Sequence, residues 1–155
     1  MGLVNGTVGY TRASYLGEVI TDWKTLDEDD MRWNIVETAL SYNGSAHRAG
    51  GRTPEGMDAL GLVAMSYMLN GIVLPHSLTL SADGPLESIT TKEMGEGDVL
   101  FFAAASMGIY IGDDRFVHAT DLVGSEGVVV SSLNPKDEDY RADLAGNITA
   151  VGTLF

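Results

Sequence analysis

The chain has three histidines and no cysteine, so it has few of the side chains that most often act as nucleophile or base near neutral pH. The most suggestive stretch is GRTPEGMDALGLVAMSYMLNG, residues 51–71, where a Gly- and Pro-rich loop leads into an apolar run with helical spacing. A loop that ends at a helix start commonly presents a nucleophile, because the helix N-terminus stabilises a thiolate there. The focal position is Ala59, which has no reactive group. The absence of cysteine also excludes disulfides, thiolate catalysis and Cys-based zinc sites.

The elements that position this stretch can be predicted from apolar spacing. One helix is expected over about 29–43, capped by Asp27 or Asp29, and a second over about 57–70, with a loop at 44–56 between them. After the second helix the pattern changes to short strands, at 98–104, 107–112, 115–120, 127–133 and 148–155. Helices followed by strands with hairpin-length links indicate an α+β domain in which an antiparallel sheet packs on helices.

Composition limits the partners that this domain can have. The chain has 155 residues, 45% of them hydrophobic, which is enough for one domain with a real core. There are 22 acidic against 9 basic residues, for a formal charge of −13, and this disfavours nucleic acid and anionic membrane as partners. No run is long and apolar enough to cross a membrane, and residues 1–20 do not read as a signal peptide.

Five segments in order carry a family likeness: HRAGG (47–51), MDALGLV (57–63), GDVLFF (97–102), SMGIYIG (106–112) and FVHA (116–119). Over about residues 30–155 the chain resembles the NlpC-type cell-wall cysteine peptidases. The resemblance implies a papain-like α+β fold over 23–155, in which N-terminal helices pack on an antiparallel sheet of about five to six strands. Residues 1–22 resemble the end of a bacterial wall-binding β-barrel of the Src-homology type, followed by a linker.

The resemblance also implies an activity and shows where this chain departs from it. Family members cleave peptidoglycan stem peptides, typically after γ-D-glutamate, with a cysteine nucleophile, a histidine base and a polar orienting residue. The matching positions here are Ala59, Ser106 and His118, so only the orienting residue is retained. Since alanine cannot attack a carbonyl and serine is no general base at neutral pH, we expect no cysteine peptidase activity.

A binding cleft is expected around these positions. By resemblance it is formed by His47, Arg48, Ala49, Asp58, Leu60, Ser106 and His118. Two of these residues have alternative roles: Asp58 either contacts substrate or caps the helix, and Arg48 either binds an anion or makes a structural ion pair. Smaller residues at the usual aromatic and cysteine positions, with Ala103, Ala104 and Ala105 beside them, should widen the cleft into a pocket for a ligand.

Three functions remain open. The first is a disabled peptidase domain, altered naturally or by deliberate remodelling, whose cleft binds a wall peptide or a small molecule. The second is a hydrolase or esterase in which His118 activates Ser106, and the third is an inert scaffold. We expect a secreted or wall-associated monomer without a cofactor, and no metal site, because His47 and His118 with Asp58 would make only a weak one.

Overall fold

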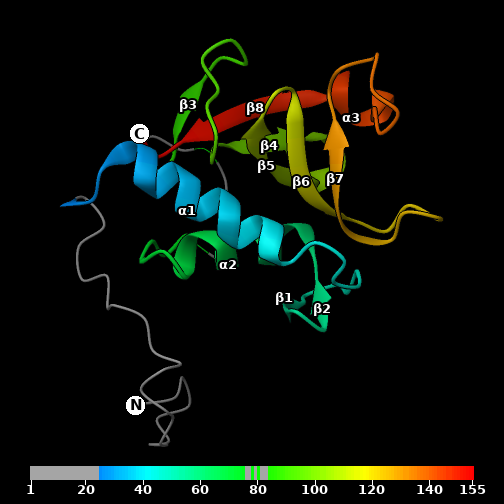
Figure 1. Cartoon of the computed structure of the whole chain (residues 1–155), viewed down its shortest axis with the longest axis horizontal. Coiled ribbons are helices and arrows are strands. Elements are labelled where there is room, and N and C mark those ends of the chain that lie inside the picture. The colour runs from blue at the N-terminus through cyan, green and yellow to red at the C-terminus, as the bar shows by residue number, and fades with distance from the viewer. Residues whose placement is uncertain (1–24, 76–77, 79, 81–83) are drawn as a thin grey trace, which may run out of the picture.

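The computed structural model describes residues 25–75, 78, 80 and 84–155, and the predicted barrel remnant at 1–22 lies outside them. Figure 1 shows the arrangement of the elements. In chain order they are α1 (Glu28–Ser41), β1 (Arg52–Thr53), β2 (Gly56–Met57), α2 (Ala59–Met68), β3 (Glu87–Ile89), β4 (Val99–Phe102), η3 (Ala103–Ala105), β5 (Met107–Gly112), β6 (Arg115–Thr120), β7 (Gly127–Ser132), α3 (Ala142–Ala145) and β8 (Ile148–Thr153).

The two long helices form where apolar spacing predicts them. Asp27 is the N-cap of α1, and its carboxylate accepts a hydrogen bond from the backbone N–H of Asp29 at 3.0 Å. Met31, Ile35 and Ala39 are buried along one side of this helix, as their helical spacing requires. Past the end of α1, Gly44 has a φ of 89°, a left-handed conformation that glycine adopts without strain.

Six strands form one antiparallel sheet in the order β3-β8-β4-β5-β6-β7. The prediction of an α+β fold with a sheet of five to six strands is confirmed, and β3 is the strand that apolar patterning missed. The predicted loop at 44–56 contains a short hairpin, β1–β2. The strand predicted over 98–104 ends at Phe102, because Ala104 and Ala105 turn into left-handed backbone with φ of 60° and 59°.

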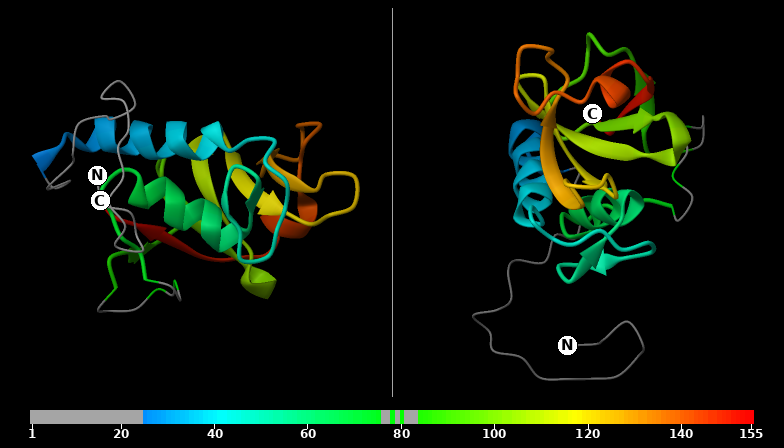
Figure 2. Two further views of the ribbon diagram at one scale, coloured as in Figure 1. Left: turned by 90° about the horizontal axis from the view of Figure 1, so that it is seen from below. Right: turned by 90° about the vertical axis from the view of Figure 1, so that its right-hand side faces the viewer.

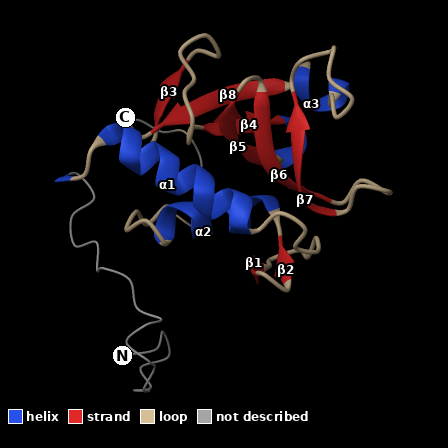
Figure 3. Cartoon of the chain, viewed as in Figure 1, coloured by secondary structure: helices blue, strands red, loops and turns tan. Residues whose placement is uncertain are grey.

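The helices and the sheet form two layers, seen in Figures 2 and 3. Both α1 and α2 pack against the same face of the sheet, over a core that includes Ile35, Tyr67 and Ile109. Because side chains alternate along a strand, Phe102 and Phe116 point to the opposite face, where Leu144 of α3 joins them. No helix in the described part of the chain is long and apolar enough to cross a membrane.

A buried carboxylate joins the first helix to the sheet. Asp98, at the start of β4, is fully buried and accepts hydrogen bonds from Arg32 Nη1 at 2.9 Å, Thr153 Oγ1 at 2.7 Å and the backbone N–H of Gly95 at 2.7 Å. The Arg32 guanidinium also lies 4.3 Å from the centre of the Phe155 ring. These contacts fix α1 relative to β4 and β8 and so hold the two layers in register.

Candidate functional site

The start of α2 is held rigidly by Asp58. Its side chain accepts hydrogen bonds from the backbone N–H of Gly61 at 2.7 Å and of Gly50 at 2.6 Å, so it caps the helix and also fastens the preceding loop. Gly61 lies so close to this loop that a Cβ there would stand 2.0 Å from the carbonyl oxygen of Gly51. Ala59, the first residue of α2, is therefore held in a fixed position at the helix N-terminus, as the loop and helix pattern of the sequence predicted.

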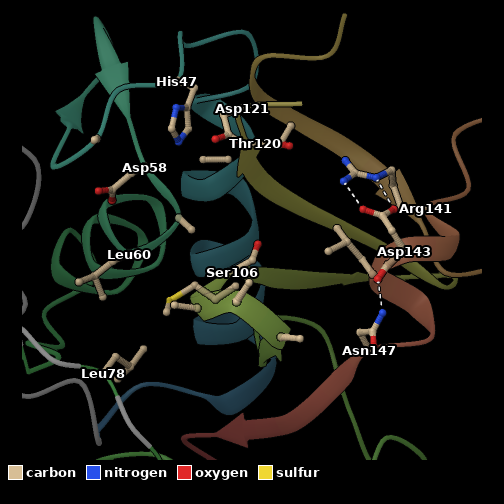
Figure 4. Close-up of a pocket in the computed structure, with 18 residues that line it drawn as sticks. His47, Asp58, Leu60, Leu78, Ser106, Thr120, Asp121, Arg141, Asp143 and Asn147 are labelled. Atoms are coloured by element: carbon tan, nitrogen blue, oxygen red, sulfur yellow. Dashed lines mark hydrogen bonds and ion pairs between the residues drawn. The ribbon is translucent and has the colours of Figure 1, made fainter. Parts of the chain in front are cut away.

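A cleft of about 940 Å³ opens between this helix start, the η3 turn, the end of β6 and α3 (Figure 4). Its volume lies within the range of small-molecule and peptide pockets. The lining residues are His47, Ala49, Asp58, Ala59, Leu60, Leu78, Ala103, Ala104, Ala105, Ser106, Met107, Ala119, Thr120, Asp121, Arg141, Asp143, Leu144 and Asn147.

Most of the residues expected in the cleft do line it, and two do not. His47, Ala49, Asp58, Leu60 and Ser106 lie on its walls together with Ala59. Arg48 is exposed outside the cleft, and its aliphatic stem lies against Gly56 of the β1–β2 hairpin. Arg48 was expected to line the cleft, but this packing places it outside the lining.

His118 is likewise absent from the cleft wall. Its imidazole is fully buried, with Nε2 at 2.9 Å from Ser131 Oγ and the ring centre 4.8 Å from that of Phe116. Nδ1 has no partner within the described residues. Burial, with a smaller contribution from the positive charge of Arg141, lowers the pKa of His118 to about 4, so the imidazole is neutral near pH 7.

Ser106 lies at the centre of the cleft in Figure 4, directly after the η3 turn. The backbone N–H of Phe102 donates to the carbonyl of Ser106 at 2.9 Å, which closes this turn. Ser106 is extended and precedes Gly108, the residue opposite His118 in the β5–β6 pair. Residues two apart on an extended chain point to the same face, so residue 106 shares a face with residues 108 and 118. Within the described residues no hydrogen bond joins the side chains of Ser106 and His118, because His118 bonds to Ser131 instead.

The cleft wall formed by α3 was missed by sequence reasoning. Arg141 donates from Nε and Nη2 to the two carboxylate oxygens of Asp143, at 2.8 and 2.7 Å, and these bonds hold the pKa of Asp143 below its usual range. Asn147 donates to the backbone carbonyl of Asp143 at 2.7 Å. The stretch has no apolar periodicity, so the sequence carried no signal for this wall.

The described residues contain no group of three or more His, Asp or Glu side chains placed to hold a metal ion. The charges on the cleft wall are thus those of Asp58, Asp121, Asp143 and Arg141, with His47 as a further titratable group.

The NlpC/P60 family model matches residues 44–142 of this chain. Dipeptidyl-peptidase 6 of Lysinibacillus sphaericus is 39% identical over 153 residues, which cover 99% of this chain and 55% of that protein. Murein DD-endopeptidase MepS/Murein LD-carboxypeptidase of Escherichia coli K12 is 34% identical over 110 residues, or 68% of this chain and 56% of that protein. The chain thus spans little more than half the length of these two relatives.

Solved structures agree with the fold. The peptidoglycan hydrolase RipB of Mycobacterium tuberculosis is similar with a TM-score of 0.64 and 19% identity, over 90% of this chain and 73% of that one. The NlpC/p60 domain of the peptidoglycan hydrolase SagA is similar with a TM-score of 0.56 and 25% identity, over 66% of this chain and 89% of that one.

Proposed function

The chain belongs to the NlpC/P60 family, and on this premise we propose that it binds a peptidoglycan stem peptide in its cleft without cleaving it. The relatives reported above are named as peptidases and hydrolases, some of them of murein or peptidoglycan. We extend the ligand, and a secreted or wall-associated location, from those relatives to this chain.

The absence of cleavage follows from the side chains at the start of α2 and before β5. Ala59 presents a methyl group at the position of the family nucleophile, and the chain has no cysteine elsewhere to replace it. At the base position, Ser106 cannot take up a proton near neutral pH. An acyl transfer through a thiolate therefore has neither its nucleophile nor its base.

The main support for ligand binding is the open cleft beside the rigidly held start of α2. Asp58 fastens both the helix start and the loop before it, and the cavity of about 940 Å³ remains open beside them. The side chains around the cleft leave it open, although larger ones would bury more apolar surface. Its polar wall groups on an otherwise apolar lining suit a ligand with several hydrogen-bonding groups.

The hydrolase alternative has less support. It needs His118 to accept a proton from Ser106, but the imidazole is buried, outside the cleft and bonded to Ser131. A serine-reactive fluorophosphonate probe distinguishes the two functions. We expect no labelling of the chain, and labelling that is abolished by Ser106→Ala would favour the hydrolase.

Binding is tested by titrating the isotope-labelled full chain with L-Ala-γ-D-Glu-L-Lys and following amide NMR signals, while mass spectrometry monitors the peptide. We expect saturable shifts at cleft residues and an intact peptide. The matched pair Ala59→Leu and Ala64→Leu adds the same bulk to α2, but only position 59 lines the cleft.

Ala59→Leu should weaken binding at least about tenfold, as overpacking of a fitted site commonly does, while Ala64→Leu should leave binding unchanged. Saturable binding that neither variant affects would place the peptide elsewhere. No binding at all to the folded parent chain would favour the inert scaffold and refute the proposal.

A further inference from the structure

We propose that the cleft binds an aliphatic side chain of its ligand at the end next to Ala59, on a floor formed by Leu60, Leu78 and Met107. This inference rests on the proposed function for the cleft as a ligand site, and it adds the chemical class of one ligand group. It follows from the way apolar and polar side chains are divided between the two ends of the cleft.

The apolar end of the cleft is the outer surface of the main core. Leu78, Met107 and Ala119 line the cleft and also belong to the core cluster, and Ala59 and Leu60 pack against that cluster. Because Leu78, Met107 and Ala119 are at most 7% exposed, packing in the core fixes the floor that they form. An aliphatic ligand group on this floor would remove apolar surface from water, both its own and that of the protein.

The opposite end of the cleft carries polar side chains. In Figure 4 Leu60 and Leu78 lie on one side of Ser106, and Arg141 lies on the other. Arg141 is bonded to Asp143, and its buried Nη1 has no partner within the described residues. Polar groups of a ligand are therefore better placed against the α3 wall than at the apolar end.

The carboxylate of Asp58 does not make the apolar end a polar site. Its two oxygens accept backbone N–H groups at 2.7 and 2.6 Å, so its hydrogen-bonding capacity is largely used within the protein. A polar ligand group placed against Leu60 and Met107 would lose hydrogen bonds to water on that side, whereas an aliphatic group has none to lose. The apolar end therefore favours an aliphatic group over a polar group of the same shape.

The test uses the full chain and three neutral probes with the same backbone: N-acetyl-L-leucinamide, N-acetyl-L-asparaginamide and N-acetyl-L-alaninamide. The leucine and asparagine side chains have nearly the same shape, but only leucine is apolar. Binding is measured by NMR titration. We expect the leucine probe to bind at least about tenfold more tightly than the other two, since each buried methylene contributes roughly three- to fourfold.

Two matched variants and one contact measurement locate the site. Leu60→Asn makes the apolar end polar at nearly constant shape, and Leu69→Asn makes the same change at the C-terminal end of α2, where Leu69 is 57% exposed and outside the cleft. Leu60→Asn should reduce the advantage of the leucine probe at least about threefold, while Leu69→Asn should leave it unchanged. In the parent chain, nuclear Overhauser contacts should join the methyl groups of the leucine probe to those of Leu60 and Met107, whether or not either variant folds.

Three results would overturn the inference. The first is equal binding of the leucine and asparagine probes to the parent chain. The second is a leucine probe whose methyl contacts all lie outside the apolar end, and the third is an advantage of the leucine probe that survives Leu60→Asn in a folded chain.

The stem peptide separates this inference from the proposed function. If the leucine probe binds at the apolar end while the stem peptide fails to bind, the proposed function fails and the aliphatic subsite stands. If the peptide binds in the cleft but the leucine and asparagine probes bind alike, the subsite fails and the proposed function stands.

Discussion

Lowering the pH should destabilise this protein through His118. The imidazole is buried with a pKa of about 4, against 6.5 for a free histidine side chain. Above pH 6.5 the side chain is neutral in both the folded and the unfolded chain, so it contributes no pH dependence. Between pH 6.5 and 4 the unfolded chain binds a proton that the folded chain does not, and stability therefore falls as the pH falls. The difference between the two pKa values corresponds to roughly 3 kcal/mol of unfolding free energy.

The assay is urea unfolding from about pH 7 to pH 4, for the parent chain and for His118→Gln. Glutamine keeps an amide group that can reach Ser131 but does not titrate, so the difference between the two curves isolates the histidine from the many carboxylates. We expect the parent to lose roughly 3 kcal/mol more than the variant over this range. Parallel curves, or an NMR titration that gives His118 a pKa near 6.5, would refute the assignment of a buried neutral imidazole.

Three further predictions concern the supports of the site, each measured by urea unfolding. Gly61→Ala should cost about 3 kcal/mol or abolish folding, because its methyl group would overlap the carbonyl oxygen of Gly51; a loss below about 0.5 kcal/mol would contradict the close approach. Asp98→Ala should cost about 3–5 kcal/mol, because it leaves the Arg32 guanidinium without its buried partner; near-wild-type stability would mean that the pair is not needed. Ala104→Gly should stabilise the chain by up to about 1 kcal/mol, because glycine relieves the left-handed backbone at φ 60°; a loss of stability would argue against that conformation.

The parts of the fold that could be predicted are those set by local pattern. The apolar spacing of Met31, Ile35 and Ala39 fixes one face of α1, and Asp27 supplies the cap that starts it. The β5 and β6 strands follow from short apolar runs on either side of the Asp113–Asp114 turn. The position of Ala59 at a capped helix start could also be predicted, because the loop, the cap and the helix are consecutive in the chain.

The features of the site that could not be predicted depend on which strands pair and which segments border the cleft. Sequence placed His118 in the cleft through its counterpart in the family, but its hydrogen-bond partner is Ser131 on the neighbouring strand β7. That choice is set by tertiary packing, which no local pattern reports. Arg141 and Asp143 belong to a polar segment with one short helical turn, so nothing in their spacing indicated a cleft wall.

The most direct test of the central claim, that the cleft still recognises a wall peptide and lacks only the reacting groups, is a double substitution. Ala59→Cys and Ser106→His together restore a thiol at the rigid helix start and an imidazole on the same face of the β5–β6 pair as His118. The double variant and the parent chain are each incubated with L-Ala-γ-D-Glu-L-Lys, and the products are followed by mass spectrometry. The account predicts cleavage by the double variant and none by the parent. A folded double variant that leaves the peptide intact, or a parent chain that cleaves it, would contradict the account.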